Sequence, residues 1–187
     1  MSWCELSAIR KVQIESNKDI TFSKVFVPKY LEKLSNFNGK KIIEIGCGTG
    51  HLAKELTSLI KFENYIALEP SLGMYEKAKD ILKDYNCLEL NNFSIGDLKG
   101  GIKADIILAH LVFHVVEDIE TLLEDSFERL QPNAKLLISL PHPCFYNDYK
   151  NIFNEDEYSY NDEIKTNTLF RISQDNANDV KVPYIHR

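Results

Sequence analysis

The chain has 187 residues, of which 44% are hydrophobic and 27% are charged, and its formal net charge at pH 7 is −6. This length suits one domain, which buries about 70% of its unfolded surface without metals or disulfides. The acidic balance argues against a broad nucleic-acid interface, and the sequence has neither the apolar run of a membrane span nor a signal-peptide core. We therefore expect a cytoplasmic protein that contacts neither nucleic acid nor membrane.

Residues 1–38 are predicted to be helical. Between Phe22 and Leu34 the apolar residues follow a helical spacing that Pro28 interrupts, which favours one or two short helices. These helices precede a segment of very different character, in which apolar runs alternate with helical patterns.

The segment 41–60 combines a short apolar run, a glycine turn and a helical pattern. Lys41–Ile45 predicts a buried strand, and Gly46, Gly48 and Gly50 follow it. Glycine lacks a Cβ, so a ligand can lie directly against the backbone, and the next helix directs free N–H groups at an anionic group. The turn favours a nucleotide-like ligand, although tight strand-to-helix turns also need glycine for structural reasons.

Two carboxylates stand where a nucleotide site needs them. Glu69 ends the apolar run Asn64–Leu68, roughly 20 residues past the glycines, which is the spacing of an acid that binds a ribose. Asp97 ends the stretch Phe93–Asp97, where it could accept the amino group of an adenine. Each has a structural interpretation as well, Glu69 as a helix cap and Asp97 as a turn residue.

The later apolar runs complete the prediction of the fold. Strands are predicted at 105–109 and 135–140, and helical faces lie between the strands, including one within 119–130. Strands without a polar face suit a parallel sheet that is covered on both sides. We expect an α/β fold with a doubly wound, mostly parallel sheet.

The exact glycine spacing separates two kinds of adenosine cofactor. A dinucleotide fingerprint places a third glycine at position 51, where this chain has His51. The segment 44–50 reads Glu-Ile-Gly-Cys-Gly-Thr-Gly and resembles the first motif of class I S-adenosylmethionine-dependent methyltransferases, (Asp/Glu)-x-Gly-x-Gly-x-Gly. The resemblance covers about residues 40–145, points to the small-molecule methyltransferases of the type 11 and 25 groups, and implies their Rossmann-like fold.

The resemblance also implies a cofactor and its contacts. S-adenosyl-L-methionine would be the cofactor, and S-adenosyl-L-homocysteine the product. The implied binding residues are Glu44, Gly46 and Gly48 at the methionine part, Glu69 at the ribose, Pro70 and Met74 in the pattern that follows it, Asp97 and Leu98 at the adenine, and Ala109 at the end of the fourth strand.

Methyl transfer needs an aligned acceptor lone pair and, for many acceptors, removal of a proton. His110 and His114 follow the fourth strand and His142 follows the fifth, at the sheet edge where ligands bind in open α/β folds. They are weak candidate bases, because the interpretation of each one as a hydrogen-bonding pocket or structural histidine is favoured over that of a base. The four cysteines show no Cys-x-x-Cys pairing, so we expect neither a metal site nor a disulfide framework.

The C-terminal region, 146–187, is predicted to hold a lid and a hairpin. The acidic, tyrosine-rich stretch 146–162 could be a lid over the acceptor or a solvated loop, and Thr168–Ser173 and Val180–Val182 have strand character. In relatives two further strands follow, so we expect a C-terminally shortened sheet in which the strand at 136–140 has an exposed edge. Such an edge is a template for pairing, which predicts cover by the hairpin or a homodimer.

One domain is therefore predicted, with N-terminal helices at 1–38, a cofactor-binding core at 39–145 and a lid and hairpin at 146–187. Its expected function is S-adenosylmethionine-dependent methylation of a small molecule. The alternative is a cofactor-binding protein that lost catalysis with its C-terminal strands. A nicotinamide-dependent oxidoreductase is disfavoured by His51.

Overall fold

The computed structural model describes residues 2–37, 39–142, 152–153, 158–172, 174 and 179–187. Cys144 and most of the predicted lid, 146–162, lie outside the described residues. None of the helices in the described part combines the length and the apolar character needed to cross a lipid bilayer.

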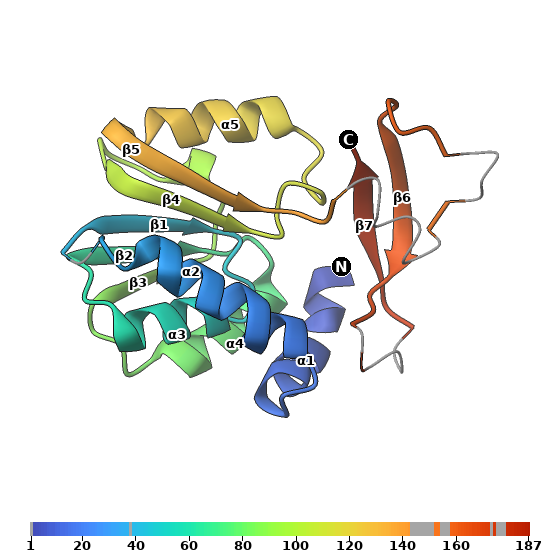
Figure 1. Cartoon of the computed structure of the whole chain (residues 1–187), viewed down its shortest axis with the longest axis horizontal. Helices are drawn as coiled ribbons and strands as arrows, with labels where there is room; N and C mark the ends of the chain where they lie inside the picture. Colours follow the sequence, from blue (N-terminus) through green and yellow to red (C-terminus); the bar gives the residue numbers. More distant parts are fainter. Residues whose placement is uncertain (1, 38, 143–151, 154–157, 173, 175–178) are drawn as a thin grey trace.

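A five-stranded sheet in which all pairs are parallel forms the centre of the molecule, in the order β3-β2-β1-β4-β5 (Figure 1). Its strands are β1 (Lys41–Ile45), β2 (Asn64–Leu68), β3 (Leu88–Asn91), β4 (Ala104–His110) and β5 (Leu130–Ser139). The helices that connect them are α3 (His51–Leu59), α4 (Leu72–Leu82) and α5 (Ile119–Glu128). The predicted doubly wound α/β fold is confirmed.

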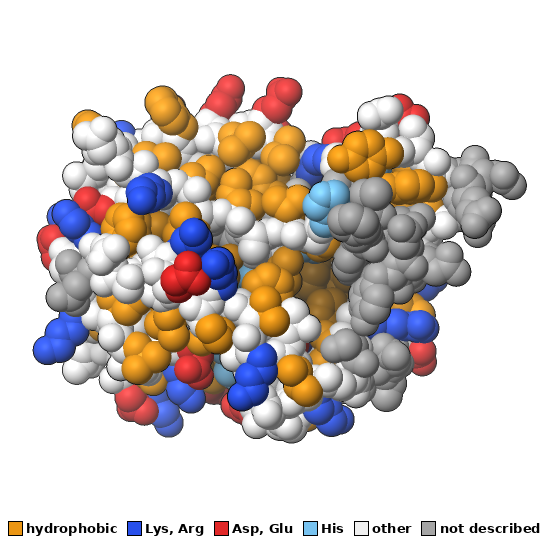
Figure 2. Space-filling model, in the orientation of Figure 1, with side chains coloured by type: hydrophobic (Ala, Val, Ile, Leu, Met, Phe, Trp, Pro, Cys, Tyr) orange, Lys and Arg blue, Asp and Glu red, His pale blue; other side chains and the backbone are white. Residues whose placement is uncertain are grey.

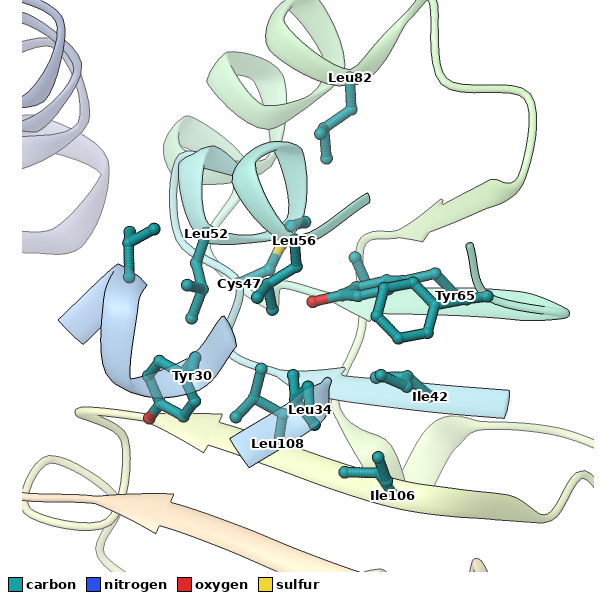
Figure 3. Packing of buried hydrophobic residues seen from close by; sticks show 14 of the residues in the cluster. Tyr30, Leu34, Ile42, Cys47, Leu52, Leu56, Tyr65, Leu82, Ile106 and Leu108 are labelled. Carbon is teal, nitrogen blue, oxygen red and sulfur yellow. The ribbon is translucent and has the colours of Figure 1, made fainter. Parts of the chain in front are cut away.

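Both faces of the sheet are covered, which explains why its central strands lack a polar face. Helices α2 (Val27–Leu34), α3 and α4 pack on one face, and α5 packs on the other (Figure 1). The buried apolar side chains that pack on the sheet form two clusters, one on each face. Figure 3 shows side chains of the first cluster, in which Leu34, Leu56 and Leu82 from these helices pack with residues of β1, β2 and β4. The second cluster includes Ile43 and Ile107, which pack with Leu122 of α5.

The N-terminal helices follow the prediction around Pro28. A π-helical turn, Phe22–Phe26, leads directly into α2, and Pro28 occupies the first turn of that helix. Proline is tolerated there because the first N–H groups of a helix have no intrahelical partner. The long helix α1 (Ser2–Glu15) comes before this turn and packs on α4.

The stretch Phe93–Asp97 follows the third strand of the sheet and is not part of it. β3 ends at Asn91, and Ile95–Asp97 forms a 3₁₀ turn after it. Ile95 is buried in the second cluster, so the apolar residues of this stretch fill the space beneath α5 instead of extending the sheet.

A hairpin forms from β6 (Ile164–Leu169) and β7 (Lys181–His186), which pair antiparallel as a separate two-stranded sheet. The prediction that this hairpin covers the edge of β5 is wrong. The N–H of Ile185 donates to the carbonyl oxygen of His114 at 2.7 Å, and the Arg187 guanidinium donates to the carbonyl oxygens of Phe113 and Glu117. These bonds fasten the hairpin to the loop after β4, beside α1 and away from β5.

The outer edge of β5 therefore has no strand partner among the described residues. Apolar side chains gather over β5 and α5 (Figure 2), and the exposed ones are Leu123, Phe127, Ile138 and Leu140. The homodimer through this edge stays a prediction.

Sedimentation velocity tests the homodimer. We expect a mass of about twice 21.6 kDa, because two identical strand edges can pair antiparallel about a twofold axis. Ile138→Lys should dissociate the dimer by placing a charge in the apolar contact, whereas Leu59→Lys, on the exposed side of α3, should not. A monomeric mass at every concentration would contradict the prediction.

Candidate functional site

A cavity of about 880 Å³ lies at the carboxyl ends of β1 and β4, where the strand order reverses. Ligands of open α/β sheets bind at this switch point. The cavity is lined by the glycine turn after β1, the start of α4, the loop after β4, α1 with the turn that follows it, and the hairpin.

The three glycines of the turn all have positive φ, at 63° for Gly46, 57° for Gly48 and 79° for Gly50. A Cβ added at Gly46 would lie 2.8 Å from Val112, and one at Gly50 would lie 2.9 Å from Leu82. A Cβ at Gly48 would meet no atom within 4 Å. The absence of a side chain at Gly46 and Gly50 therefore allows Val112 and Leu82 to pack against the turn, whereas at Gly48 it leaves bare backbone that faces open space.

Glu69 holds this turn in place. Its carboxylate accepts hydrogen bonds from the N–H of Gly48 at 2.7 Å and from the N–H of Ser71 at 2.8 Å. The second bond is made to Ser71, the N-cap residue of α4, so Glu69 does stabilise the start of that helix, as its interpretation as a helix cap predicted. The contact of Glu69 with a ribose stays a prediction. Burial raises the pKa of Glu69, although both N–H bonds oppose the rise.

Glu44 is a second buried acid of the same cavity, with 1% of its surface exposed. Its Oε2 accepts a hydrogen bond from the Tyr65 hydroxyl at 2.8 Å. Burial raises the pKa of Glu44 to about 7, and the nearby Glu69 adds to the rise. Within the described part of the chain, no cation forms an ion pair with either acid.

Two of the three candidate histidines line the cavity. The Nδ1 of His110 lies 2.7 Å from the Ser139 hydroxyl, and the Nδ1 of His114 has no hydrogen-bond partner among the described residues. Burial lowers the pKa of both rings to about 4, so both are neutral at pH 7. His142 is exposed and does not line the cavity.

The structure brings together most of the predicted cofactor residues but not all of them. Glu44, Gly46, Gly48, Glu69, Pro70 and Met74 line the cavity. Asp97 is exposed, accepts a hydrogen bond from the Ser94 hydroxyl and does not line it. Leu98 and Ala109 are buried in the second hydrophobic cluster and likewise do not line it.

Sequence reasoning missed several polar residues of the cavity wall, among them Arg10, Asp19 and His51. Arg10 and Gln13 lie on the side of α1 that carries the buried Leu6, and this spacing was the available signal. The described residues contain no group of three or more histidine, cysteine, aspartate or glutamate side chains that could hold a metal ion.

Comparison with protein families decides where the chain belongs, because a methyltransferase domain family matches residues 43–136. The chain belongs to this methyltransferase family. The match starts within β1 and ends within β5, so it contains the glycine turn, both buried acids and the loop after β4.

The relatives with similar sequences include both a short protein and a much longer synthetase. An uncharacterized Haemophilus influenzae protein is 32% identical over 124 residues, which is 62% of this chain and 48% of that protein. The hybrid synthetase thnA of Trichoderma harzianum is 32% identical over 108 residues, 52% of this chain and 3% of the synthetase. This methyltransferase domain thus spans about half of the first relative and a small part of the second.

Solved structures share the fold at lower identity. The DhpI complex with S-adenosylhomocysteine has a TM-score of 0.55 at 19% identity and covers 72% of this chain and 66% of that one. Coclaurine N-methyltransferase, bound to N-methylheliamine and S-adenosylhomocysteine, has a TM-score of 0.53 at 20% identity and covers 60% of this chain and 34% of that one. These likenesses confirm the Rossmann-like methyltransferase fold.

The different surroundings of the glycines predict different costs of substitution. Gly50→Ala should lower the free energy of unfolding by about 2–3 kcal/mol, since a methyl group there combines an unfavourable positive φ with overpacking against Leu82. Gly48→Ala should cost about 1 kcal/mol, for the backbone conformation alone. Urea denaturation measures both, with Gly101→Ala as the control, and equal losses at Gly48 and Gly50 would contradict this account.

The raised pKa of Glu44 predicts a pH-dependent effect of Glu44→Gln. Between about pH 4.5 and 7 the folded state keeps a proton that the unfolded state releases, so this group makes the protein less stable as the pH rises. The variant should gain stability over the parent protein across this range, by on the order of 3 kcal/mol. Comparing the two proteins cancels the opposite contribution of the buried histidines.

Urea denaturation at a series of pH values measures this difference. The same exchange at the exposed Glu55 is the control, because it alters the charge without removing a buried acid. A constant difference between Glu44→Gln and the parent protein from pH 4.5 to 7 would show that Glu44 is not responsible.

Proposed function

We propose that this chain is an S-adenosylmethionine-dependent methyltransferase that acts on a small-molecule acceptor. The observation that carries the proposal is the pair of buried carboxylates, Glu44 and Glu69, beside the bare backbone of Gly48 in a cavity of about 880 Å³. Buried acids without a described cation favour a ligand that brings positive charge. S-adenosylmethionine does so with its sulfonium and its ammonium group.

The same acids disfavour a dinucleotide. A pyrophosphate at the glycine turn would place negative charge close to Glu69, whose carboxylate is 2.7 Å from the nitrogen of Gly48. Like charges that are poorly solvated repel one another strongly. The nicotinamide-dependent alternative therefore conflicts with the charge of the site as well as with His51.

When bound, S-adenosylmethionine supplies a methyl group on a positively charged sulfur. The chain's own residues would hold the adenosyl ligand against Gly48 and exclude water with the apolar wall that includes Phe22, Phe26 and Val112. His114 lines the cavity with a neutral ring, so it is a candidate for taking a proton from the acceptor.

One known complex supports a small acceptor by analogy. Coclaurine N-methyltransferase holds N-methylheliamine together with S-adenosylhomocysteine. The alternative of a binding protein that lost catalysis finds no support in the family match or in these neighbours. The cytoplasmic location stays a prediction.

Isothermal calorimetry with S-adenosylhomocysteine and with NAD tests the proposal. We expect binding of the first compound and none of the second. Glu69→Gln should weaken S-adenosylhomocysteine by one to two orders of magnitude if the carboxylate also holds the ribose, since a charged hydrogen bond contributes about 1.5–3 kcal/mol. Glu63→Gln, at an exposed acid, is the matched control.

A screen of small acceptors with radiolabelled cofactor then tests turnover. Binding of NAD without S-adenosylhomocysteine would overturn the proposed cofactor. Cofactor binding without label transfer to any acceptor would favour the alternative of a binding protein.

A further inference from the structure

Tyr65 and Glu44 form a buried contact near the end of β1. They lie two positions apart in the register of the neighbouring parallel strands β2 and β1, so both side chains stand on one face of the sheet. The Tyr65 hydroxyl donates to Oε2 of Glu44 at 2.8 Å, and neither residue exposes more than 1% of its surface. Figure 3 shows this hydroxyl pointing toward Cys47 of the glycine turn. The tyrosine therefore fixes one oxygen of the acid.

The other oxygen of Glu44, Oε1, is reached from the cavity. Glu44 lines the cavity, whereas Tyr65 does not. Oε1 has no hydrogen-bond partner among the described residues, and it is not one of the fully buried polar atoms that lack a partner. Tyr65 thus holds the acid from the side of the hydrophobic core and leaves Oε1 for a ligand.

No cation is paired with Glu44 in the described part of the chain. Among those residues, the cations that line the cavity are Arg10, which is paired with Asp19 at 2.9 Å, and Arg171, which is exposed. The titratable groups of the elements around the acid are Tyr65 of β2, Glu69 after β2, Tyr30 of α2, Cys47 of the glycine turn, His51 of α3 and His110 of β4. Burial raises the pKa values of the two tyrosines and the cysteine, and it lowers the pKa of each histidine to about 4, so all five are neutral at pH 7. The remaining group, Glu69, is an acid like Glu44.

These surroundings make Glu44 an acid for which a proton and a positively charged ligand compete. Burial raises its pKa to about 7, the hydrogen bond from Tyr65 opposes the rise, and Glu69 adds to it. The bond from Tyr65 opposes the rise because it favours the carboxylate over the protonated acid. A positive group beside Oε1 favours the carboxylate in the same way, so its arrival displaces the proton into water.

We propose that Tyr65 is a positioning residue for the adenosyl ligand: its hydroxyl holds Oε2 of Glu44 so that Oε1 meets the ammonium group of the ligand, and binding releases the proton that Glu44 carried. The inference rests on the proposed function, because it assigns the pair to a ligand of that site. One proton passes from the carboxyl group to solvent, the carboxylate pairs with the ammonium group, and no other bond changes. The affinity for the ligand therefore rises with pH through the range in which Glu44 ionises, and Tyr65 sets that range without touching the ligand.

Calorimetry in two buffers measures the released proton. The heat of S-adenosylhomocysteine binding at pH 7 is compared in phosphate and in Tris, whose ionisation heats differ, and the difference gives the number of protons released. We expect about half a proton per ligand from the parent protein, because an acid with a pKa of about 7 is half ionised at that pH. Glu44→Gln should lose this release. The parent protein should release no proton with 5′-methylthioadenosine, which lacks the ammonium group.

Tyr65→Phe tests the positioning role, because it removes the hydroxyl and leaves the ring in the core. Without the bond that favours its carboxylate, Glu44 keeps its proton to higher pH, so the affinity for S-adenosylhomocysteine should fall about fivefold at pH 7 and recover toward pH 9. Comparison with the parent protein at each pH cancels the titration of the ligand's own amino group. The affinity for 5′-methylthioadenosine should not change.

Tyr85→Phe is the matched control, since it removes a hydroxyl that lies 3.2 Å from Oγ of Ser58, at a residue that does not line the cavity. It should change neither affinity at any pH. Circular dichroism checks that each variant is folded. The proton release by the parent protein needs no variant, so it tests the inference even if a variant does not fold.

The results that overturn the inference differ from those that overturn the proposed function. If the parent protein binds S-adenosylhomocysteine without releasing a proton, or if Glu44→Gln releases as many protons as the parent, Glu44 is not the acid that meets the ammonium group. A loss of affinity in Tyr65→Phe that is equal for both compounds and constant with pH would show that the tyrosine is only structural. If the parent protein does not bind S-adenosylhomocysteine at all, the proposed function fails first.

Discussion

The carboxylate of Glu69 joins the two backbone segments from which the site is built. One of its oxygens holds the N–H of Gly48 in the turn after β1, and the other holds the N–H of Ser71 where α4 begins. Since α1 packs on α4, the position of Arg10 depends on the same junction. A single buried acid thereby links the turn after β1 to the start of α4, the helix on which α1 packs.

The parallel sheet explains why such a junction can exist at all. Strands β1 and β4 are neighbours whose connections leave in opposite directions, so their carboxyl ends open a crevice that no helix fills. Burial on both faces supplies the stability that an open crevice does not. Three glycines with positive φ and two carboxyl groups with raised pKa values lie at this end of the sheet.

The local features of this arrangement could be predicted from the sequence, and the long-range ones could not. The strand, glycine turn and helix at 41–59 follow from residues that are adjacent in the chain, and the spacing of Glu69 follows from one crossover unit. The hairpin was misplaced because its position depends on remote contacts, such as Ile185 with His114 and Trp3 with Phe170. Arg10 was missed for the same reason, since only tertiary packing turns a helix residue into part of a cavity wall.

The cavity has an uneven distribution of charge, and this distribution limits how a ligand can be oriented. Glu44 and Glu69 lie beside the glycine turn without a cation among the described residues, whereas Arg10, on the wall that α1 contributes, is paired with Asp19. A ligand that brings its positive groups to Glu44 and Glu69 is stabilised, and the reverse orientation leaves like charges buried together. Because uncompensated charges cost far more in a cavity than in water, the protein can select the orientation of its ligands before any reaction occurs.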